Sequence, residues 1–118
     1  MTARRGEVVI ALFPHALGTG TKPRPVLVVQ SDVYNAKMQN IVVAAITSNL
    51  RHATDPASVL IDIATPDGKA SGLLQTSVVS CMNLATIDES LVAKKVGQLP
   101  VSLMQRVDAS LKNALGLP

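Results

Sequence analysis

One arginine of the sequence lies between two prolines, in the run Lys22-Pro23-Arg24-Pro25, directly before an apolar stretch. Pro25 favours an extended backbone at Arg24, and Pro23 fixes its own φ, so the segment is stiff before any ligand binds. A cation held in place in advance can stabilise the negative charge that develops during phosphoryl transfer, because it needs no reorganisation in the transition state. An ordinary surface salt bridge of Arg24 is the alternative, and on this run alone it is the favoured one.

Three polar side chains follow one another in Thr47-Ser48-Asn49, at the end of the apolar run 41–46. Hydroxyl and amide groups at the point where a buried strand emerges can donate hydrogen bonds to a phosphate. The same residue types also begin turns and cap strand ends, and this second interpretation stays open. Each feature is weak alone, whereas the pair indicates a phosphate-binding site.

Other catalytic arrangements have little support in the sequence. The histidines are His15 and His52, without metal-ligand spacing, and we expect neither a metal site nor a cofactor. The single cysteine, Cys81, lies in an apolar run, which favours a buried and inert thiol. The chain has no Gly-x-Ser-x-Gly elbow, and Gly18-Thr19-Gly20 lacks the rest of a phosphate-cradling fingerprint.

Composition indicates a folded, basic protein outside the membrane. Of the 118 residues, 47% are hydrophobic and 16% are charged, so we expect one domain over residues 1–118 with its own core. The net charge of +3 mildly favours a polyanionic partner, but one Phe, one Tyr and no Trp cannot build a base-stacking platform. The apolar run after Glu7 is too short for a membrane span and no signal peptide is evident, which together with the lone cysteine indicates the cytoplasm.

The pattern of apolar residues predicts a mainly β chain that ends in a helix. The runs 25–30 and 41–47 are continuously apolar, which predicts strands buried on both faces in the middle of a sheet. Near the C-terminus, apolar residues recur every four positions from Leu103 to Leu115, which predicts an amphipathic helix. Such an order argues for an α+β or barrel-like domain. Further strands are expected at 7–13, 59–63, 77–82 and 92–99, and loops or single helical turns at 15–23, 31–35, 66–68 and 86–91.

Five blocks of the sequence, taken in order, resemble successive segments of the MazF/PemK toxins. They are Arg5-Gly6-Glu7-Val8-Val9, Arg24-Pro25-Val26-Leu27-Val28-Val29-Gln30-Ser31-Asp32, Ala44-Ala45-Ile46-Thr47-Ser48, Thr86-Ile87-Asp88 and Lys95-Val96-Gly97-Gln98-Leu99. The blocks span nearly the whole chain, and Arg-Pro combined with Ile-Thr-Ser is the most specific part. The resemblance implies an SH3-like, CcdB/PemK-type barrel with a C-terminal helix. It also implies a type II toxin that dimerises about a twofold axis and cleaves single-stranded RNA without metal, as an mRNA interferase.

The resemblance further implies which residues act. The catalytic Arg of Arg-Pro and Thr of Thr-Ser correspond to Arg24 and Thr47. The other branch of the family uses an Arg and an Asp on a later strand, where this chain has Ser80 and Met82, so the chain resembles the MazF branch. The implied reaction is attack of an RNA 2′-OH on the adjacent phosphate, with Arg24 stabilising the charge and Thr47 donating a hydrogen bond. Further RNA contacts are expected from Thr21, Lys22, Ser48, Asn49, Gln75 and Asn83.

The expected binding partners are an antitoxin and a second copy of the chain, and two alternative functions stay open. A small acidic antitoxin is expected to bind the basic cleft, and a second copy of the chain to form the dimer. Two rivals keep the same barrel: a DNA gyrase poison like CcdB, whose Trp near the C-terminus this chain lacks, and a non-catalytic SH3-like binding module. His15 in the first loop either reaches the site or stays solvated, and solvation is the favoured alternative.

Overall fold

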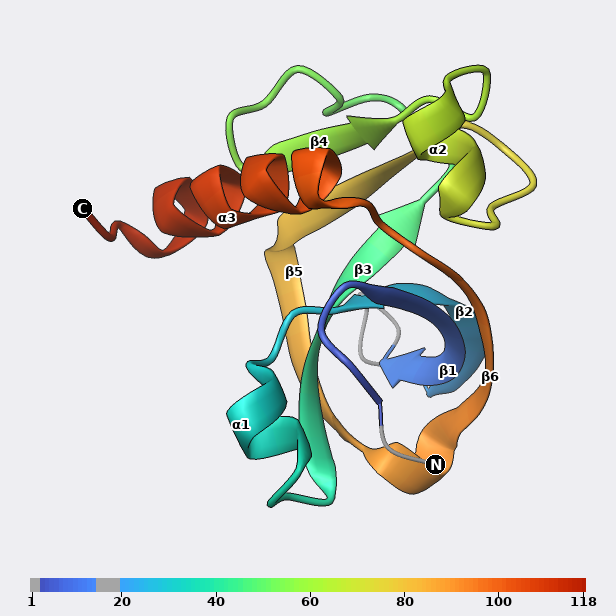
Figure 1. Cartoon of the computed structure of the whole chain (residues 1–118), viewed down its shortest axis with the longest axis vertical. Coiled ribbons are helices and arrows are strands. Elements are labelled where there is room, and N and C mark those ends of the chain that lie inside the picture. The colour runs from blue at the N-terminus through green and yellow to red at the C-terminus, as the bar shows by residue number, and fades with distance from the viewer. Residues whose placement is uncertain (1–2, 15–19) are drawn as a thin grey trace.

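The computed structural model of the chain describes residues 3–14 and 20–118 (Figure 1). Within these ranges, antiparallel strands form one sheet and short helices join them, so the expected mainly β fold with a C-terminal helix is confirmed. The strands are β1 (Glu7–Pro14), β2 (Thr21–Val28), β3 (Asn40–Thr47), β4 (Ser58–Ile61), β5 (Ser77–Asp88) and β6 (Val92–Gln98). The helices are α1 (Asp32–Asn35), α2 (Pro66–Ala70), the 3-10 turn η1 (Glu89–Leu91) and α3 (Val101–Leu115).

The strand order is β4-β5-β3-β2-β1-β6, which places β2 and β3 in the middle as their continuous apolar runs predict. Over the described ranges β4 and β6 are both free edges, so the SH3-like barrel that the resemblance implies is an open, strongly bent sheet and is not closed. Register shifts interrupt the β1–β6 and β3–β5 ladders, and such bulges bend strands. Figure 1 shows the bend in β5 and the curl of β1, β2 and β6.

Three element boundaries differ from the expectations. β2 begins at Thr21, so the Lys22-Pro23-Arg24-Pro25 run is part of a strand and not of the loop before it. β5 continues to Asp88, which leaves the expected helical turn only Glu89–Leu91. The expected turn after residue 65 is a short helix, because the Thr65 side chain accepts a hydrogen bond from the Gly68 N–H and caps it.

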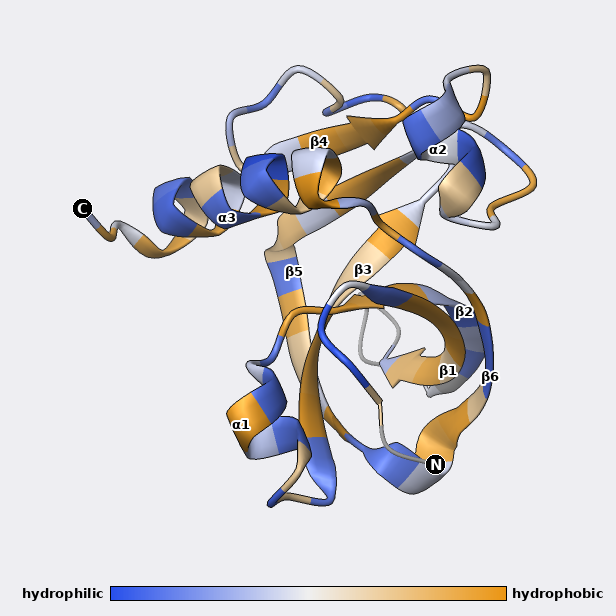
Figure 2. Ribbon diagram, in the orientation of Figure 1, coloured by the Kyte–Doolittle hydropathy of each residue, from blue (hydrophilic) through white to orange (hydrophobic). Residues whose placement is uncertain are grey.

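Neighbouring residues of the central strands bury their side chains in two different hydrophobic clusters. Val8 of β1 belongs to the first cluster, which α3 covers by packing on β4 and β5, whereas Val9 belongs to the second. The second cluster includes Phe13, which is 2% exposed. Figure 2 shows the hydrophobic stretches along β1, β3 and β4 and the mixed pattern of α3. Both faces of the central strands are therefore buried.

The C-terminal helix begins after Pro100 and ends at Gly116, whose φ of 70° is the left-handed conformation that favours glycine. The N-terminal part of its apolar stripe packs inside the molecule, since Leu103 and Val107 are buried in the first cluster, whereas Leu115 at its end is exposed. Arg5 ties the start of the chain to this helix through a 2.7 Å ion pair with Asp108. Across residues 3–14 and 20–118, no helix is long and apolar enough to cross a membrane.

Candidate functional site

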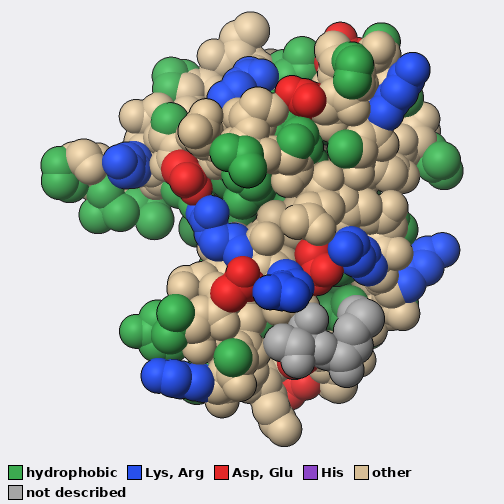
Figure 3. Space-filling model, viewed as in Figure 1, with side chains coloured by type: hydrophobic (Ala, Val, Ile, Leu, Met, Phe, Trp, Pro, Cys, Tyr) green, Lys and Arg blue, Asp and Glu red, His purple; other side chains and the backbone are tan. Residues whose placement is uncertain are grey.

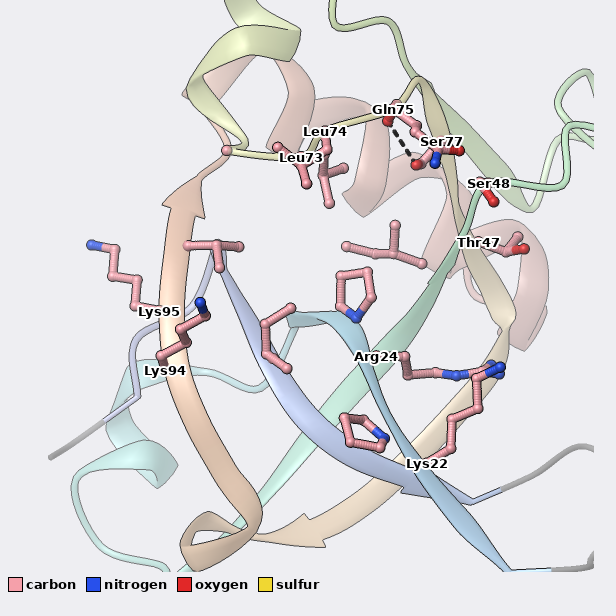
Figure 4. A pocket seen from close by; sticks show the side chains of 16 residues that line it. Lys22, Arg24, Thr47, Ser48, Leu73, Leu74, Gln75, Ser77, Lys94 and Lys95 are labelled. Carbon is pink, nitrogen blue, oxygen red and sulfur yellow. Dashed lines mark hydrogen bonds between the residues drawn. The ribbon is translucent and has the colours of Figure 1, made fainter.

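A hollow of about 900 Å³ lies between β2, the end of β3, β6 and the segment that leads into β5 (Figure 4). This volume lies within the range of about 300–1,000 Å³ that is usual for small-ligand sites. Five of the lining residues are candidate site residues from the sequence: Lys22, Arg24, Thr47, Ser48 and Gln75. The others are Ile10, Pro23, Pro25, Ile46, Gly72, Leu73, Leu74, Ser77, Lys94, Lys95 and Val96.

The two central strands separate beside this hollow. β2 pairs with β3 only from Val28 back to Val26, whereas its pairing with β1 continues to Thr21. Pro23 and Pro25 have no N–H to donate, so ladder donors are missing where the β2–β3 pairing ends. If the register of Val26 with Ala45 continued for two residues, it would place Arg24 opposite Thr47. The sequence thus sets these two side chains on facing strands beside a gap.

Arg24 is half-buried and rests on an aromatic ring. Its Cζ atom lies 5.8 Å from the ring centroid of Phe13, which is a cation–π distance. Its Nε atom is buried and has no hydrogen-bond partner among the described residues. Lys22, two residues earlier on the same face of β2, is exposed, and Figure 4 shows both cations projecting to the same side as Thr47. A buried donor without a partner favours binding of an acceptor there.

The salt bridge that the sequence left open for Arg24 does not form with any described carboxylate. The ion pairs in this part of the chain join Arg5 to Asp108 at 2.7 Å and Lys95 to Glu7 at 3.1 Å. Arg24 and Lys22 are neighbouring cations without a described carboxylate partner, so they repel each other. A bound anion would relieve that repulsion.

The hydroxyl of Thr47 is oriented by the backbone that follows it. Its Oγ1 accepts a hydrogen bond from the Asn49 N–H at 3.1 Å, so its own O–H remains available to donate. The side-chain oxygen of Asn49 accepts from the Arg51 N–H at 3.0 Å. Asn49 therefore begins a turn, and it is not among the residues that line the hollow. Ser48, between them, is exposed and lines the hollow.

Residues 72–75 form the roof of the hollow, and two glycines allow this segment to lie against β6. Gly72 has a φ of 73°, and a Cβ atom there would collide with the backbone carbonyl of Val96. A Cβ atom on Gly97 would collide with the carbonyl of Ser71. The two backbones approach so closely because neither residue carries a side chain.

The side chains of this roof segment line the hollow. Figure 4 shows Leu73 and Leu74 pointing from the roof toward the space between the strands. Gln75 is exposed beside them, and the Ser77 hydroxyl donates to its backbone carbonyl at 2.9 Å. The roof therefore offers an apolar surface next to an amide group.

The opposite wall contains two lysines that the sequence analysis missed. Lys94 and Lys95 lie on β6, and Figure 4 shows Lys94 leaning toward the hollow while Lys95 points away. Lys95 is bound to Glu7, whereas Lys94 forms no ion pair with any described residue. The sequence did contain a signal for these residues, namely two adjacent lysines in an expected strand of a basic chain. Their place at the site depends on the pairing of β6 with β1, which local sequence does not reveal.

The remaining candidates lie elsewhere or are not described. Asn83 is half-buried at the irregular part of β5, where Ala44 and Ala45 pair with Leu84 and Ser80, and it does not line the hollow. His15 lies outside the described residues. For Thr21, the structure describes the backbone only, as the first residue of β2.

No described residue of this site is suited to metal binding or thiol chemistry. No cluster of three or more His, Cys, Asp or Glu side chains suited to a metal ion occurs in the described part of the chain. Cys81 is 1% exposed, which confirms the expected burial, and this burial raises the pKa of its thiol to about 11.

The described lining residues are cations, hydroxyls, an amide and apolar groups, without a histidine or a carboxylate. Such groups can bind a phosphate and stabilise negative charge that develops on it. The fold and the hollow together define a small β protein with a cationic hollow whose groups suit an anion.

Comparison with known proteins agrees with this class. The family model of the PemK-like, MazF-like toxins of type II toxin-antitoxin systems matches residues 4–115. The "Endoribonuclease MazF2" of Mycobacterium bovis is 36% identical over 119 residues, covering 99% of this chain and 100% of that protein. The "Endoribonuclease EndoA" of Bacillus subtilis is 33% identical over 118 residues, covering 99% and 97%.

A solved structure has the same fold. It is a mycobacterial endoribonuclease in complex with its cognate antitoxin, with a TM-score of 0.77 and 26% identity over 98% of this chain and 97% of that one. The chain therefore belongs to the PemK-like, MazF-like toxin family, as the resemblance of its five sequence blocks predicts.

Proposed function

We propose that this toxin is an endoribonuclease that cleaves single-stranded RNA without a metal ion, and that the hollow beside Arg24 is its active site. The endoribonucleases of Mycobacterium bovis and Bacillus subtilis support the activity because their similarity covers nearly the whole chain. The cationic hollow supports a polyanionic substrate.

The observation that carries the proposal is the environment of Arg24. Its guanidinium lies over the Phe13 ring with a buried Nε that no described residue accepts from, two residues along the strand from Lys22. A preoriented donor of this kind stabilises charge in the transition state, and losing one typically costs roughly 10²- to 10³-fold in rate.

The proposed step is an in-line displacement at phosphorus. The 2′-oxygen of the RNA bonds to the adjacent phosphorus, the bond from phosphorus to the 5′-oxygen breaks, and the products are a 2′,3′-cyclic phosphate and a 5′-hydroxyl. The 2′-hydroxyl proton leaves to solvent, and the departing 5′-oxygen gains a proton. Arg24 stabilises the pentacoordinate phosphate and Thr47 donates a further hydrogen bond. Lys22, Ser48 and Gln75 contact the substrate, together with Thr21, Asn49 and Asn83 if the bound RNA extends beyond the hollow.

The test is cleavage of a long defined RNA in the presence of EDTA, with the cut positions mapped by primer extension. A second substrate is the matching oligonucleotide with one 2′-deoxy nucleotide on the 5′ side of the cut bond. We expect the all-ribose RNA to be cut and the substituted one to resist, because it lacks the attacking hydroxyl. Cleavage of both, or of neither, contradicts the mechanism.

The same preparation tests the rival functions. A protein that leaves RNA intact but inhibits DNA gyrase is a poison of the CcdB type. A protein that does neither is a non-catalytic binding module. No feature of the hollow favours either alternative over the nuclease.

We also propose an acidic antitoxin as the natural inhibitor. The related endoribonuclease was solved with its cognate antitoxin, and the lysines and arginine around the hollow complement an acidic segment. Co-expression with the neighbouring reading frame should abolish toxicity. We propose the cytoplasm as the location of the toxin, because the proposed substrate, single-stranded RNA, is found there.

A homodimer is the proposed assembly. Leu115 and Leu117 at the end of α3 are 57% and 56% exposed, and Figure 3 shows hydrophobic side chains gathered around that end of the molecule. A second copy could cover them. Sedimentation at tens of micromolar should give the mass of a dimer, and a monomer would contradict this.

A further inference from the structure

The guanidinium and the hydroxyl of the proposed active site lie on one face of the sheet. Val26 on β2 and Ala45 on β3 both belong to the second hydrophobic cluster. Because side chains alternate along a strand, Arg24 and Thr47, two residues away from them, lie on the same face. Ile46 belongs to the first cluster and faces the other way. Groups that extend the active site must therefore lie on the face of the second cluster.

Two serines continue this face onto the next strands. Ala45 pairs with Ser80 of β5, and Ser80 pairs with Ser58 of β4. Paired residues of antiparallel strands point to the same face, so both serine side chains lie on the face of Ala45. Val79 pairs with Ile46, and both belong to the first cluster, in agreement with this alternation. The register thus adds two hydroxyls to the face of the proposed active site.

The two serines face each other at one phosphate's distance from Thr47. Directly opposite residues have Cβ atoms about 5 Å apart, so the hydroxyls of Ser80 and Ser58 can donate to the same phosphate. Thr47 pairs with Val78, two residues before Ser80, which makes Thr47 and Ser80 diagonal neighbours at about 7–8 Å. The backbone between successive phosphates of a single strand can span such a distance. A strand that leaves Thr47 can therefore place its next phosphate at the serine pair.

The hydroxyls of both serines are available to a ligand. Ser80 and Ser58 are half-buried, and their hydroxyls form no hydrogen bond with a described residue. Among the described residues, Arg24 Nε is the one buried side-chain polar atom without a partner, so the two serine oxygens reach the surface. A hydroxyl that lacks a protein partner can donate to a phosphate oxygen.

The surface around the serine pair is open and flat. The helix α3 packs on β4 and β5 from the opposite face, where Leu103 belongs to the first cluster. Ala45 and Val78, which lie beside the serines on their own face, are 2% exposed and form a floor of small apolar side chains. Small side chains allow the backbone of a single strand to approach the sheet closely.

We propose that Ser80 and Ser58 form a second phosphate subsite, which binds the phosphate next to the one that is cut. Both hydroxyls donate to this phosphate while Arg24 and Thr47 hold the cut one, so the RNA runs across the sheet from β2 toward β4. The proposal rests on the proposed RNA cleavage and assigns the two serines a role in substrate binding. Holding the neighbouring phosphate keeps the cut bond in place beside Arg24.

The experiment measures Kd for RNA in which one phosphate at a time is made neutral. The RNA is the oligonucleotide that carries the mapped cut site or, if no RNA is cut, the fragment of the long RNA that wild type binds most tightly. A 2′-deoxy nucleotide at the cut site blocks cleavage. Each oligonucleotide of the set carries one methylphosphonate, which removes the charge of that phosphate.

The proteins are the wild type, Ser80→Ala, Ser58→Ala and Arg24→Ala. Ser80→Thr is the conservative variant, because it keeps the hydroxyl. Thr86→Val is the matched control for loss of a hydroxyl from β5. Thr86 is exposed on the opposite face, since it pairs with Val42, which packs against the first cluster.

On unmodified RNA, Ser80→Ala and Ser58→Ala should each raise Kd about tenfold, as loss of a hydrogen bond to a charged group does. The single-turnover rate at saturating RNA should stay near wild type, because the contact is already made in the ground state. One methylphosphonate should shrink the Kd ratio of variant to wild type, and it should be the same one for both serines. For Arg24→Ala the ratio should shrink at the adjacent phosphate. Ser80→Thr and Thr86→Val should match wild type, and all variants should melt at the wild-type temperature.

Kd ratios of the serine variants that stay constant at every phosphate overturn the proposal. A response of the two serines at different phosphates, or at the phosphate of Arg24, overturns it as well, and so does a wild-type Kd in Ser80→Ala. If wild type cuts RNA in these cases, the proposed function stands without this subsite. If wild type cuts no RNA, the proposed function fails, and the Kd ratios still decide whether the serines hold a phosphate.

Discussion

Phe13 lies diagonally across the β1–β2 ladder from Arg24, and its ring centroid is 5.8 Å from the guanidinium carbon. In the register of this ladder, Phe13 faces Lys22 and Ala11 faces Arg24. Diagonal cross-strand neighbours are within reach of aromatic and long side chains. The one phenylalanine of the chain is thus 2% exposed directly under the proposed catalytic cation.

We therefore expect Phe13→Leu to lower the rate of RNA cleavage strongly and the free energy of unfolding only modestly. The substitution keeps an apolar side chain but removes the ring face, whose attraction for a partly desolvated cation is about 1–2 kcal/mol. We expect kcat to fall about tenfold with little change in KM, because Arg24 loses its preorientation. Ile87→Val in the same cluster is the matched control, since it should cost about 1 kcal/mol of stability with no change in kcat. Equal kcat values for Phe13→Leu and wild type would show that the ring only fills space.

Lys94 and Lys95 are neighbours in sequence with different partners, which makes them a matched pair. Lys95 is bound to Glu7, whose side chain is only 9% exposed, so Lys95→Ala should lower the free energy of unfolding by about 1 kcal/mol. Lys94→Ala should leave stability unchanged, weaken RNA binding and reduce its salt dependence by about one counterion. Melting curves and Kd values at several salt concentrations measure both. The reverse pattern would place Lys95 on the RNA.

Gly72 and Gly116 share a left-handed backbone, with φ of 73° and 70°, but not their surroundings. A Cβ atom on Gly116 meets nothing within 4 Å, so Gly116→Ala should cost only the backbone strain, about 1–2 kcal/mol. Gly72→Ala adds a collision with the Val96 carbonyl, and we expect it to cost several kcal/mol more and to displace the roof. Chemical denaturation of both variants gives the difference. Equal losses would mean that the roof moves freely away from β6.

Local patterns predicted the centre of the sheet and the last helix. The runs that became β2 and β3 are apolar at successive positions because both of their faces are buried, and this leaves a signal that needs no knowledge of the partners. The helix between Pro100 and Gly116 likewise follows from its own apolar spacing and end residues. Arg24 and Thr47 were singled out by the family resemblance more than by local pattern, and both lie beside the point where β2 and β3 separate.

The rest of the site depends on contacts between distant segments. Lys94 reaches the hollow because β6 pairs with β1, and Leu74 reaches it because Gly72 and Gly97 allow two backbones to touch. Neither residue type nor spacing reveals such pairings. Asn49 does not line the hollow, and its side-chain oxygen accepts a hydrogen bond from the Arg51 N–H in the turn after β3.

The thiol of Cys81 should be unreactive in the folded protein. Burial raises its pKa from 9.0 to about 11, so the nucleophilic thiolate is scarce at pH 8. Alkylation by iodoacetamide at this pH should be slow without denaturant and fast in urea. Since the pKa is higher in the folded state, the contribution of the thiol to stability is present below about pH 9 and is lost as the pH rises through about 11. Equally fast labelling with and without urea would contradict this burial.

The pH dependence of cleavage reports which group removes the proton from the 2′-hydroxyl. The described lining of the hollow includes no histidine, aspartate or glutamate, so none of its side chains is a general base of the common kind. With hydroxide in that role, the single-turnover rate at saturating RNA should rise about tenfold for each pH unit from 6 to 8, whereas with water as the base the rate would not change with pH.

Arg24→Ala should lower that whole profile by roughly 10²- to 10³-fold without changing its slope, because it removes charge stabilisation and not a base. Thr47→Val keeps the β-branched shape and deletes the hydroxyl, so it should act in the same direction with folding preserved. Lys22→Ala should weaken RNA binding and leave the saturated rate near wild type. A profile that levels off near pH 6.5, and that regains its slope in His15→Gln, would instead identify His15 as the base. An unchanged rate in Arg24→Ala would remove Arg24 from the chemistry and leave the family and the fold as they are.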